Sequence, residues 1–169
     1  MRLSRSFLYF VPAFLWVALI FHFSSEPYKE QTIIPFLERH LNEDTWRKLL
    51  PDITIHYLHS AISAKQQPFQ FMEFIFRKSA HLFVYGMFAI VMYVAFIPFR
   101  FKAVRGAAAS LAVVACIACF DEWNQKYTAQ RTSTILDVFV DVTGGLIFLI
   151  IALLLIRWIK ISIRRKSAL

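Results

Sequence analysis

Four long apolar stretches constrain this chain more than any other feature of its sequence. They cover residues 7–23, 79–97, 106–120 and 135–156 of the 169 residues, and the span that contains the third is predicted over residues 106–125. A helix needs about 20 largely apolar residues to cross the hydrocarbon core of a bilayer, with about 17–25 as the working range. The third stretch reaches this length only if its helix continues through residues 121–125. The sequence therefore predicts an all-α membrane protein, with a bundle of four transmembrane helices as one domain over residues 1–169.

The composition agrees with a membrane protein. Hydrophobic residues make up 58% of the chain and charged residues 18%, whereas soluble domains have about 45–50% and about 25%. The first stretch is longer than the apolar region of a secretory signal, and no small-residue cleavage site follows it. We therefore interpret it as an uncleaved membrane anchor.

The net charge of +8 indicates an orientation in the membrane rather than a nucleic-acid partner. Ten of the 19 Lys and Arg residues precede the first stretch, separate the second from the third, or follow the fourth, and these three segments hold no acidic residue. Cytoplasmic loops collect Lys and Arg. We therefore predict cytoplasmic N- and C-termini, a basic tail in contact with anionic inner-leaflet lipid, and no nucleic-acid binding.

A long outer loop, residues 24–77, then lies between the first two membrane helices. Its apolar residues recur at helical spacing, so we predict short surface helices. Asn42 is placed to cap one helix that Pro51 stops, and a second helix is predicted over residues 53–64. Residues 69–77 are expected to run directly into the second membrane helix.

Polar side chains gather at the outer end of each predicted span. Ionisable groups in a bilayer are costly and are functional candidates by default. The helix rise of about 1.5 Å per residue places those of three helices within about 8 Å of the outer surface. We predict one outward-facing polar pocket. The ligand-binding candidates are Ser24, Ser25, Lys78, His81, Tyr85, Asp121, Glu122, Gln125, Arg131, Asp137 and Asp141.

Most of these candidates also have a structural interpretation. Lys78 could extend to the interface, Arg131 could form a buried ion pair with Asp137, and the two serines could be hydrogen-bonding groups at a helix end. Asp141 is the hardest to explain in this way, because a carboxylate inside a bilayer must be paired or protonated.

Two further patterns are interpreted as structural rather than chemical. Cys116 and Cys119 lie inside the third stretch, where we expect them to pack against other helices. His56 and His59 have no nearby acids, so they are a weak candidate for a metal site. We expect no metal and no cofactor.

The polar motifs resemble those of the VanZ-like membrane proteins. The similarity rests on Phe23-Ser24-Ser25, on Arg77 and Lys78 with His81 and Tyr85, and on Asp121-Glu122 with Gln125, Arg131, Asp137 and Gly144. Gln130 stands where the family usually has Gly, and Asp141 stands where it usually has Asn. The resemblance implies a multi-pass protein of the bacterial plasma membrane. It also implies a link between the cell envelope and resistance to the glycopeptide teicoplanin in Gram-positive bacteria.

Two classes of function fit these observations. The first is a protein that binds membrane lipids, in particular a lipid-linked envelope component, or an amphipathic drug such as a glycopeptide. The alternative is an intramembrane enzyme acting on a lipid-linked phosphate or sugar at the outer leaflet. His81 would then be the general base and Asp121 or Asp137 its orienting partner, while Lys78 and Arg131 would hold an anion. Transport ranks third, because no repeat or broken helix is visible.

Overall fold

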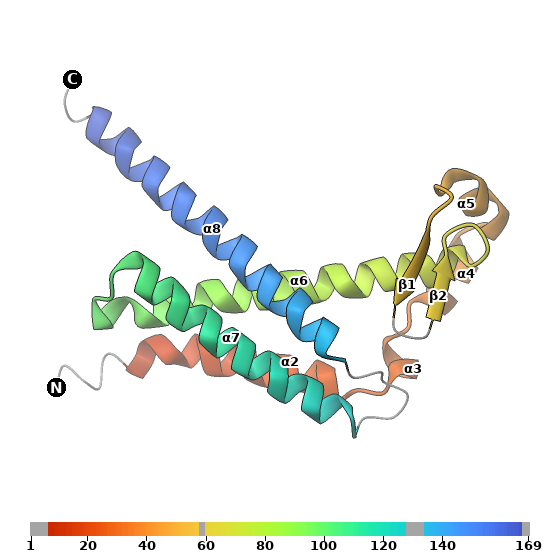
Figure 1. The fold of residues 1–169 in the computed structure, drawn as a ribbon, viewed down its shortest axis with the longest axis horizontal. Coiled ribbons are helices and arrows are strands. Elements are labelled where there is room, and N and C mark those ends of the chain that lie inside the picture. The colour runs from red at the N-terminus through yellow and green to blue at the C-terminus, as the bar shows by residue number, and fades with distance from the viewer. Residues whose placement is uncertain (1–6, 58–59, 128–133, 167–169) are drawn as a thin grey trace. The chain divides into compact units, whose positions relative to one another are not determined.

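The computed structural model describes residues 7–57, 60–127 and 134–166, and the chain is mostly helical, at 81%. Within these residues, four helical segments are long and apolar enough to cross a membrane. They are Leu8–Ser25, Pro68–Phe99, Ala103–Gln125 and Ile135–Arg165 (Figure 1). The prediction of four helices long and apolar enough to cross a membrane is therefore confirmed, while the cytoplasmic position of the termini stays a prediction.

The four long helices begin and end close to the predicted positions. A 3-10 turn, Leu8–Phe10, precedes α2, which covers Val11–Ser25. Helix α6 covers Pro68–Phe96 and helix α7 covers Ala103–Gln125, so both predicted continuations into polar sequence are confirmed. Helix α8 covers Ile135–Lys166 and extends ten residues beyond the predicted end. Its last residues include no Gly or Pro, so nothing in the local sequence stops the helix.

The connection between α6 and α7 is short. A second 3-10 turn, Ile97–Phe99, follows α6 and has Pro98 in its first positions. Arg100 then adopts a left-handed backbone conformation with φ of 54°, and its N–H bonds to the carbonyl oxygen of Ile97. This conformation reverses the chain and closes the helix end.

The chain divides into two compact units, which we describe separately. The bundle unit comprises Met1–Glu26 and His81–Leu169, and the loop unit comprises Pro27–Ala80. The first thirteen residues of α6 belong to the loop unit, and the rest belong to the bundle unit.

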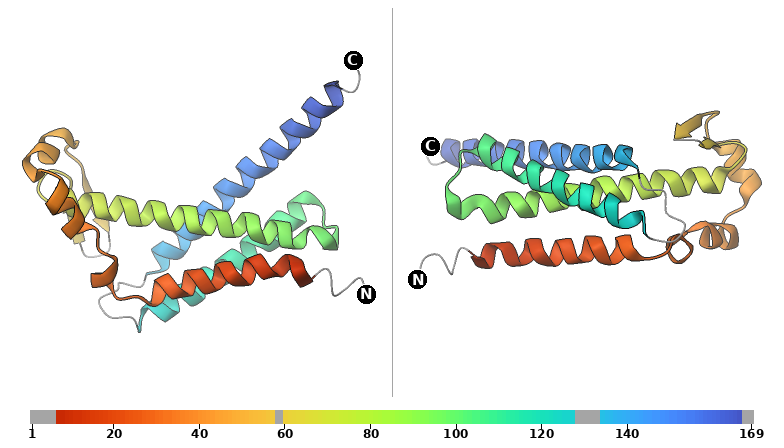
Figure 2. Two further views of the ribbon diagram at one scale, coloured as in Figure 1. Left: turned by 180° about the vertical axis from the view of Figure 1, so that it is seen from behind. Right: turned by 60° about the horizontal axis from the view of Figure 1, so that its bottom comes forward.

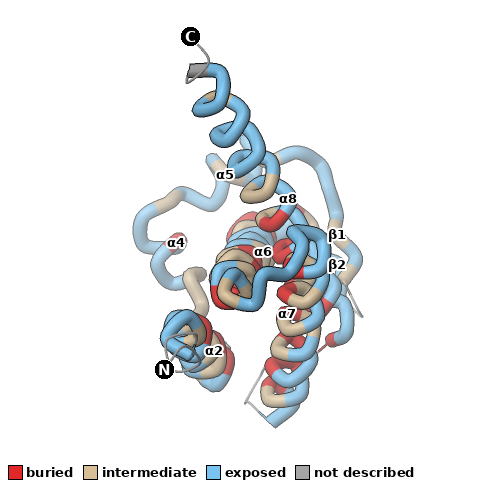
Figure 3. The backbone as a smooth tube through the Cα atoms, turned by 90° about the vertical axis from the view of Figure 1, so that its left-hand side faces the viewer, coloured by how far each residue is buried: buried red, intermediate tan, exposed pale blue. Residues whose placement is uncertain are grey.

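In the bundle unit, α7 packs against both α8 and α2. The core holds Tyr85, Phe88 and Ala89 of α6, Val114 of α7 and Leu149 of α8. Figure 3 shows the buried positions gathered where α6, α7 and α8 face one another. The Trp16 side chain on α2 donates to the backbone oxygen of Val84 at 3.0 Å, which ties α2 to α6.

Helices α6 and α8 cross at very close range. A Cβ atom added at Gly144 would lie 2.8 Å from Cα of Leu82, so only glycine fits this crossing. Gly144 therefore permits the close approach of the two helices. Beyond the crossing, the C-terminal half of α8 diverges from the other helices of the bundle unit (Figure 2). Its residues from Leu154 to Arg165 are almost all exposed.

In the loop unit, three short helices follow the end of α2: α3 (Tyr28–Gln31), α4 (Ile34–His40) and α5 (Glu43–Leu49). The Asn42 side chain accepts a hydrogen bond from the backbone N–H of Thr45 at 3.2 Å. Asn42 is therefore the N-cap of α5, as predicted, and the helix ends just before Leu50 and Pro51.

The predicted helix over residues 53–64 is wrong, because this segment forms a β-hairpin. Strand β1 (Thr54–Tyr57) pairs antiparallel with β2 (Ser60–Ser63), and Ile55 lies opposite Ile62. Thr and Ile are β-branched and favour strands. The side chains of Ile55 and Ile62 therefore lie opposite each other on two paired strands instead of along one face of a helix. The bundle is helical, but the expectation of an entirely α-helical chain needs this correction.

The expected packing role of Cys116 and Cys119 is also wrong. Both are exposed free thiols on α7. The fully buried positions nearby are Val114 and Ala118, which lie on a different face of the same helix because each is two residues from a cysteine.

Candidate functional site

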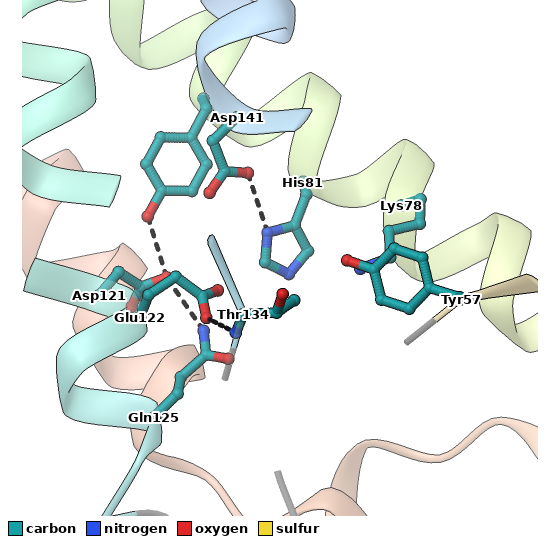
Figure 4. Close-up of polar contacts among 9 residues, drawn as sticks. Tyr57, Lys78, His81, Asp121, Glu122, Gln125, Thr134 and Asp141 are labelled. Atoms are coloured by element: carbon teal, nitrogen blue, oxygen red, sulfur yellow. Dashed lines mark hydrogen bonds and ion pairs between the residues drawn. The ribbon is translucent and has the colours of Figure 1, made fainter. Parts of the chain in front are cut away.

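Two neighbouring residues of α6 contact carboxylates on two other helices. His81 Nδ1 lies 3.0 Å from Oδ1 of Asp141 on α8. The Tyr85 hydroxyl donates to Oδ2 of Asp121 on α7 at 2.9 Å. His81 and Tyr85 are one helical turn apart, so they project from the same face. Figure 4 shows the His81 side chain directed toward Asp141.

Asp121 receives two hydrogen bonds on the same oxygen. Besides Tyr85, Gln125 donates through Nε2 to Oδ2 at 3.1 Å. Asp121 and Gln125 are four residues apart on α7, the spacing at which helical side chains are neighbours. The hydrogen bond fits this spacing, and both side chains are buried.

Glu122 links the end of α7 to the start of α8. Its Oε2 atom accepts from the backbone N–H of Thr134 at 2.7 Å. The Thr134 hydroxyl in turn accepts a hydrogen bond from the backbone N–H of Leu136 at 3.3 Å. The Thr134 backbone oxygen accepts one from the backbone N–H of Asp137 at 3.0 Å. Thr134 therefore caps α8, and the helix dipole favours the negative charge of Asp137 in the first turn.

These residues form one buried group with many carboxylates. Asp121, Glu122, Asp137 and Asp141 are each less than a tenth exposed. We call these four acids together with His81, Tyr85 and Gln125 the polar cluster.

The buried acceptor atoms of the polar cluster include two carboxylate oxygens that make no hydrogen bond among the described residues. They are Oδ1 of Asp121 and Oδ2 of Asp141. A buried acceptor that makes no hydrogen bond costs about 1–3 kcal/mol. A bound group with hydrogen-bond donors would therefore stabilise the site most by donating to these two oxygens.

The end of α2 is held against the end of α7. Asn124 donates through Nδ2 to the Ser25 hydroxyl at 3.1 Å. Ser24 is buried, and its hydroxyl has no partner among the described residues. Asn124 was absent from our sequence-based candidates, although it belongs to the same polar run as Asp121 and Gln125.

In the loop unit, Lys78 contacts two aromatic side chains. Its Nζ atom donates to the Tyr57 hydroxyl at 3.0 Å and lies 4.3 Å from the centre of the Tyr57 ring (Figure 4). The same atom is 5.5 Å from the centre of the Phe74 ring. Hydrogen bonding and cation–π attraction thus join Lys78 to strand β1. No sequence pattern pointed to Tyr57, because the hairpin that places it was not predicted.

Glu73 is the buried acid of the loop unit, and sequence reasoning missed it too. It accepts from the Thr32 hydroxyl at 2.7 Å, and Arg77 approaches it at 3.9 Å. The Arg77 guanidinium also lies 4.5 Å over the Tyr28 ring. Burial, followed by the neighbouring Glu73 carboxylate, raises the pKa of the Tyr28 hydroxyl. Glu73 therefore joins α3 and the following turn to α6.

The structure changes one expected partnership. His81 is paired with Asp141, whereas we had expected Asp121 or Asp137 to orient it. Asp121 instead binds Tyr85 and Gln125. Arg131 lies outside the described residues, so its expected pairing with Asp137 stays a prediction. His59, the second histidine of the weak metal candidate, also lies outside them.

Comparison with known proteins gives one match. A family model described as VanZ/LLP1 matches residues 9–157. This range contains every residue of the polar cluster and all but the last part of α8. No curated protein and no solved structure matches the chain.

Proposed function

Because the chain belongs to the VanZ-like family and is a multi-pass membrane protein, we propose that its polar cluster binds an amphipathic ligand at the outer face of the bacterial plasma membrane. The ligand is a lipid-linked envelope component or a glycopeptide antibiotic such as teicoplanin. The proposal includes the outward orientation of the cluster.

The observation that carries this proposal is the pair of buried acceptors without a described donor, Asp121 Oδ1 and Asp141 Oδ2. A bundle held together only by internal hydrogen bonds gains nothing from leaving such atoms without donors. The donors of a bound headgroup would offset the cost of about 1–3 kcal/mol for each atom.

The surroundings of the polar cluster favour an amphipathic ligand over a fully polar one. Large apolar side chains next to the cluster in sequence are exposed, with Phe120 and Trp123 on α7 and Phe139 on α8. In a membrane these side chains would contact acyl chains. A ligand with a polar head and an apolar body matches both the acids and these neighbours.

An enzyme remains the second candidate, and the pairing of His81 with Asp141 favours it. A carboxylate on Nδ1 fixes the orientation of the imidazole ring and stabilises the imidazolium that forms when the ring accepts a proton. His81 would act as the general base on a lipid-linked phosphate or sugar, and Asp141 would position it.

The binding proposal is tested with purified protein in lipid nanodiscs and fluorescent teicoplanin. We expect saturable binding that Asp121→Asn and His81→Ala each weaken about tenfold, because each removes a hydrogen bond or a charge contact of the cluster. Asp52→Asn, at an exposed position of the loop unit, is the matched control and should bind like the wild type. Equal affinity in all four proteins would rule out the polar cluster as the binding site.

The enzyme candidate needs a separate test. Radiolabelled lipid-linked envelope precursors are incubated with the wild type, His81→Ala and Asp52→Asn. A product formed by the wild type and by Asp52→Asn, but not by His81→Ala, would support catalysis. If no precursor is converted, this candidate is rejected and the binding proposal is unaffected.

A further inference from the structure

Buried polar atoms without a hydrogen bond occur on three helices of the bundle unit. Among the described residues, Asp121 Oδ1 on α7, Asp141 Oδ2 on α8 and the Ser24 hydroxyl on α2 make none. From these three groups we infer that the polar head bound by the cluster is a neutral, sugar-like group with several hydroxyls. The inference rests on the proposed function and specifies the chemistry of the ligand's head.

The two carboxylates are linked through neighbouring rings of α6. The His81 ring contacts Asp141, and the Tyr85 hydroxyl donates to Asp121. The centres of the His81 and Tyr85 rings are 6.3 Å apart, and their planes are nearly parallel, at 15°. One ligand head with several hydroxyls can therefore reach both carboxylates.

Ser24 lies at the end of α2 that is held against α7. The hydroxyl of its neighbour Ser25 accepts from Nδ2 of Asn124 at 3.1 Å. Asn124 follows Asp121 by three residues on α7, a spacing at which helical side chains are neighbours. Ser24 is only 5% exposed, so it adds a buried group that is not an acid to this end of the bundle unit.

The hydrogen-bonding capacity of these three groups distinguishes between possible heads. A carboxylate oxygen accepts, whereas the Ser24 hydroxyl both donates and accepts. An ammonium head has donors but no acceptor for the Ser24 O–H, and an ionised phosphate has acceptors but no donor for the two carboxylates. A hydroxyl has both. A sugar carries several hydroxyls on one ring, and this fixed arrangement reduces the entropy lost on binding.

The bonding already present at Asp121 is of the same kind. Its Oδ2 atom accepts from the Tyr85 hydroxyl and from the Gln125 side-chain amide, which are both neutral donors. A ligand hydroxyl at Oδ1 would extend this pattern. Neutral hydroxyls also cost far less than ions to remove from water, which matters because Asp121 belongs to a helix apolar enough to cross a membrane.

Access to the polar cluster is available beside His81. The His81 side chain is 24% exposed, while the Asp141 side chain bonded to it is 0% exposed. A sugar-like head would enter on this side and direct some of its hydroxyls to the buried oxygens. Its remaining hydroxyls would stay at the exposed side.

The experiment compares different heads on one alkyl chain. The wild type in lipid nanodiscs is labelled with a dodecyl glucoside that carries a photoreactive group in its chain, and labelled peptides are identified by mass spectrometry. Dodecyl glucoside, its fully O-methylated form, dodecylamine and dodecyl phosphate then compete for labelling. The O-methylated form keeps the chain, the ring and every oxygen but has no O–H donor, so it is the matched control.

We expect saturable labelling of the peptides that contain Asp121 or Asp141. Dodecyl glucoside should compete at about tenfold lower concentration than each of the other three compounds. Asp121→Asn should weaken labelling about tenfold and Ser24→Ala about threefold. Ser60→Ala, at an exposed position of the loop unit, should be labelled like the wild type. The competition series uses only the wild type, so it decides the question even if a variant fails to fold.

A second series separates two sources of the sugar. Teicoplanin is compared with its sugar-free aglycone, and a lipid-linked envelope sugar is compared with the same lipid without its sugar. We expect the sugar-bearing member of at least one pair to compete more strongly, and that pair identifies the source. Equal competition within both pairs would contradict a sugar-like head.

The glucoside series can also overturn the inference. Equal competition by dodecyl glucoside and its O-methylated form would show that O–H donors do not contribute, and stronger competition by dodecylamine or dodecyl phosphate would show an ionic head. These results would leave the proposed binding function intact. If no labelling is saturable while fluorescent teicoplanin still binds, the inference fails alone. If teicoplanin also fails to bind, the glycopeptide form of the proposed function fails with it.

Discussion

His81 and Asp141, sixty residues apart in the sequence, meet at 3.0 Å between Nδ1 and Oδ1. The contact joins α6 to α8 beside the place where Gly144 passes the backbone of Leu82. Asp141 is fully buried, and an unpaired charge in such a position is very costly. His81 is the hydrogen-bond partner of Asp141 among the described residues. The close glycine crossing and the His–Asp pair therefore depend on the same alignment of two helices.

This pair predicts an energetic coupling that a double-mutant cycle can measure. His81→Ala leaves Asp141 buried without its partner and should destabilise the protein by roughly 3–5 kcal/mol. Adding Asp141→Leu removes the stranded carboxylate, so the double variant should recover part of that loss. We expect a coupling energy of about 1.5–3 kcal/mol, measured by reversible unfolding in detergent. A cycle with Asp52→Leu provides the control, and additive effects in both cycles would refute the coupling.

The glycine crossing predicts unequal effects at two adjacent positions. Gly144→Ala places a methyl group against the Leu82 backbone, which cannot move aside, while at Gly145 the neighbouring atoms belong to side chains 3.2–3.4 Å away. We expect Gly144→Ala to destabilise the bundle unit by about 1–3 kcal/mol and Gly145→Ala to cost clearly less. Thermal unfolding in detergent compares them directly. Equal losses would mean that α6 and α8 do not cross at Gly144.

The contact between Lys78 and Tyr57 predicts how the hairpin responds to substitution. Tyr57→Phe removes the hydrogen bond at 3.0 Å but keeps the ring beneath the ammonium group, whereas Tyr57→Leu removes both. Each contribution is about 0.5–1.5 kcal/mol. Amide hydrogen exchange in β1 and β2 should therefore rise modestly in the Phe variant and more in the Leu variant. Lys78→Met should resemble Tyr57→Leu; unchanged exchange in all three would contradict the contact.

The environment of Tyr28 predicts a pH effect confined to the loop unit. The pKa of Tyr28 is raised above its usual value of 10.0, first by burial and then by Glu73. The folded state thus favours the neutral phenol, and this contribution to stability is fully present below pH 10 and is lost as the pH rises through the folded pKa. The tyrosinate absorbance that disappears in Tyr28→Phe should titrate above pH 10. In Glu73→Gln it should titrate at a lower pH than in the wild type.

The charge distribution predicts which side of the membrane each connection faces. In a variant in which Cys116 and Cys119 are replaced by serine, Asp52→Cys and Lys102→Cys each supply a single thiol at an exposed position. A membrane-impermeant maleimide applied to intact cells should label the cysteine at position 52. It should label the one at position 102 only after permeabilisation. The reverse pattern would invert the topology and place the polar cluster on the cytoplasmic side.

The helices of the bundle could be predicted because their signal is local. A long apolar stretch specifies a membrane helix wherever its neighbours lie, and Ala103–Gln125 ends at the residue that helix rise required. The N-cap of α5 at Asn42 follows from one side chain and the next three residues in the same way. The hairpin escaped prediction because Ile55 and Ile62 can lie on a helix face or on paired strands, and only their pairing distinguishes the two.

The sequence alone determined that four apolar helices carry polar groups at one end, because composition and helix rise depend only on residue order. It also indicated every member of the polar cluster, since polar side chains in an apolar helix are conspicuous. Only the tertiary structure decided that His81 pairs with Asp141, that Tyr85 and Gln125 share one oxygen of Asp121, and that Lys78 contacts Tyr57. These partnerships depend on how helices rotate and cross, and that is set by contacts such as Gly144 against Leu82 between residues far apart in the chain.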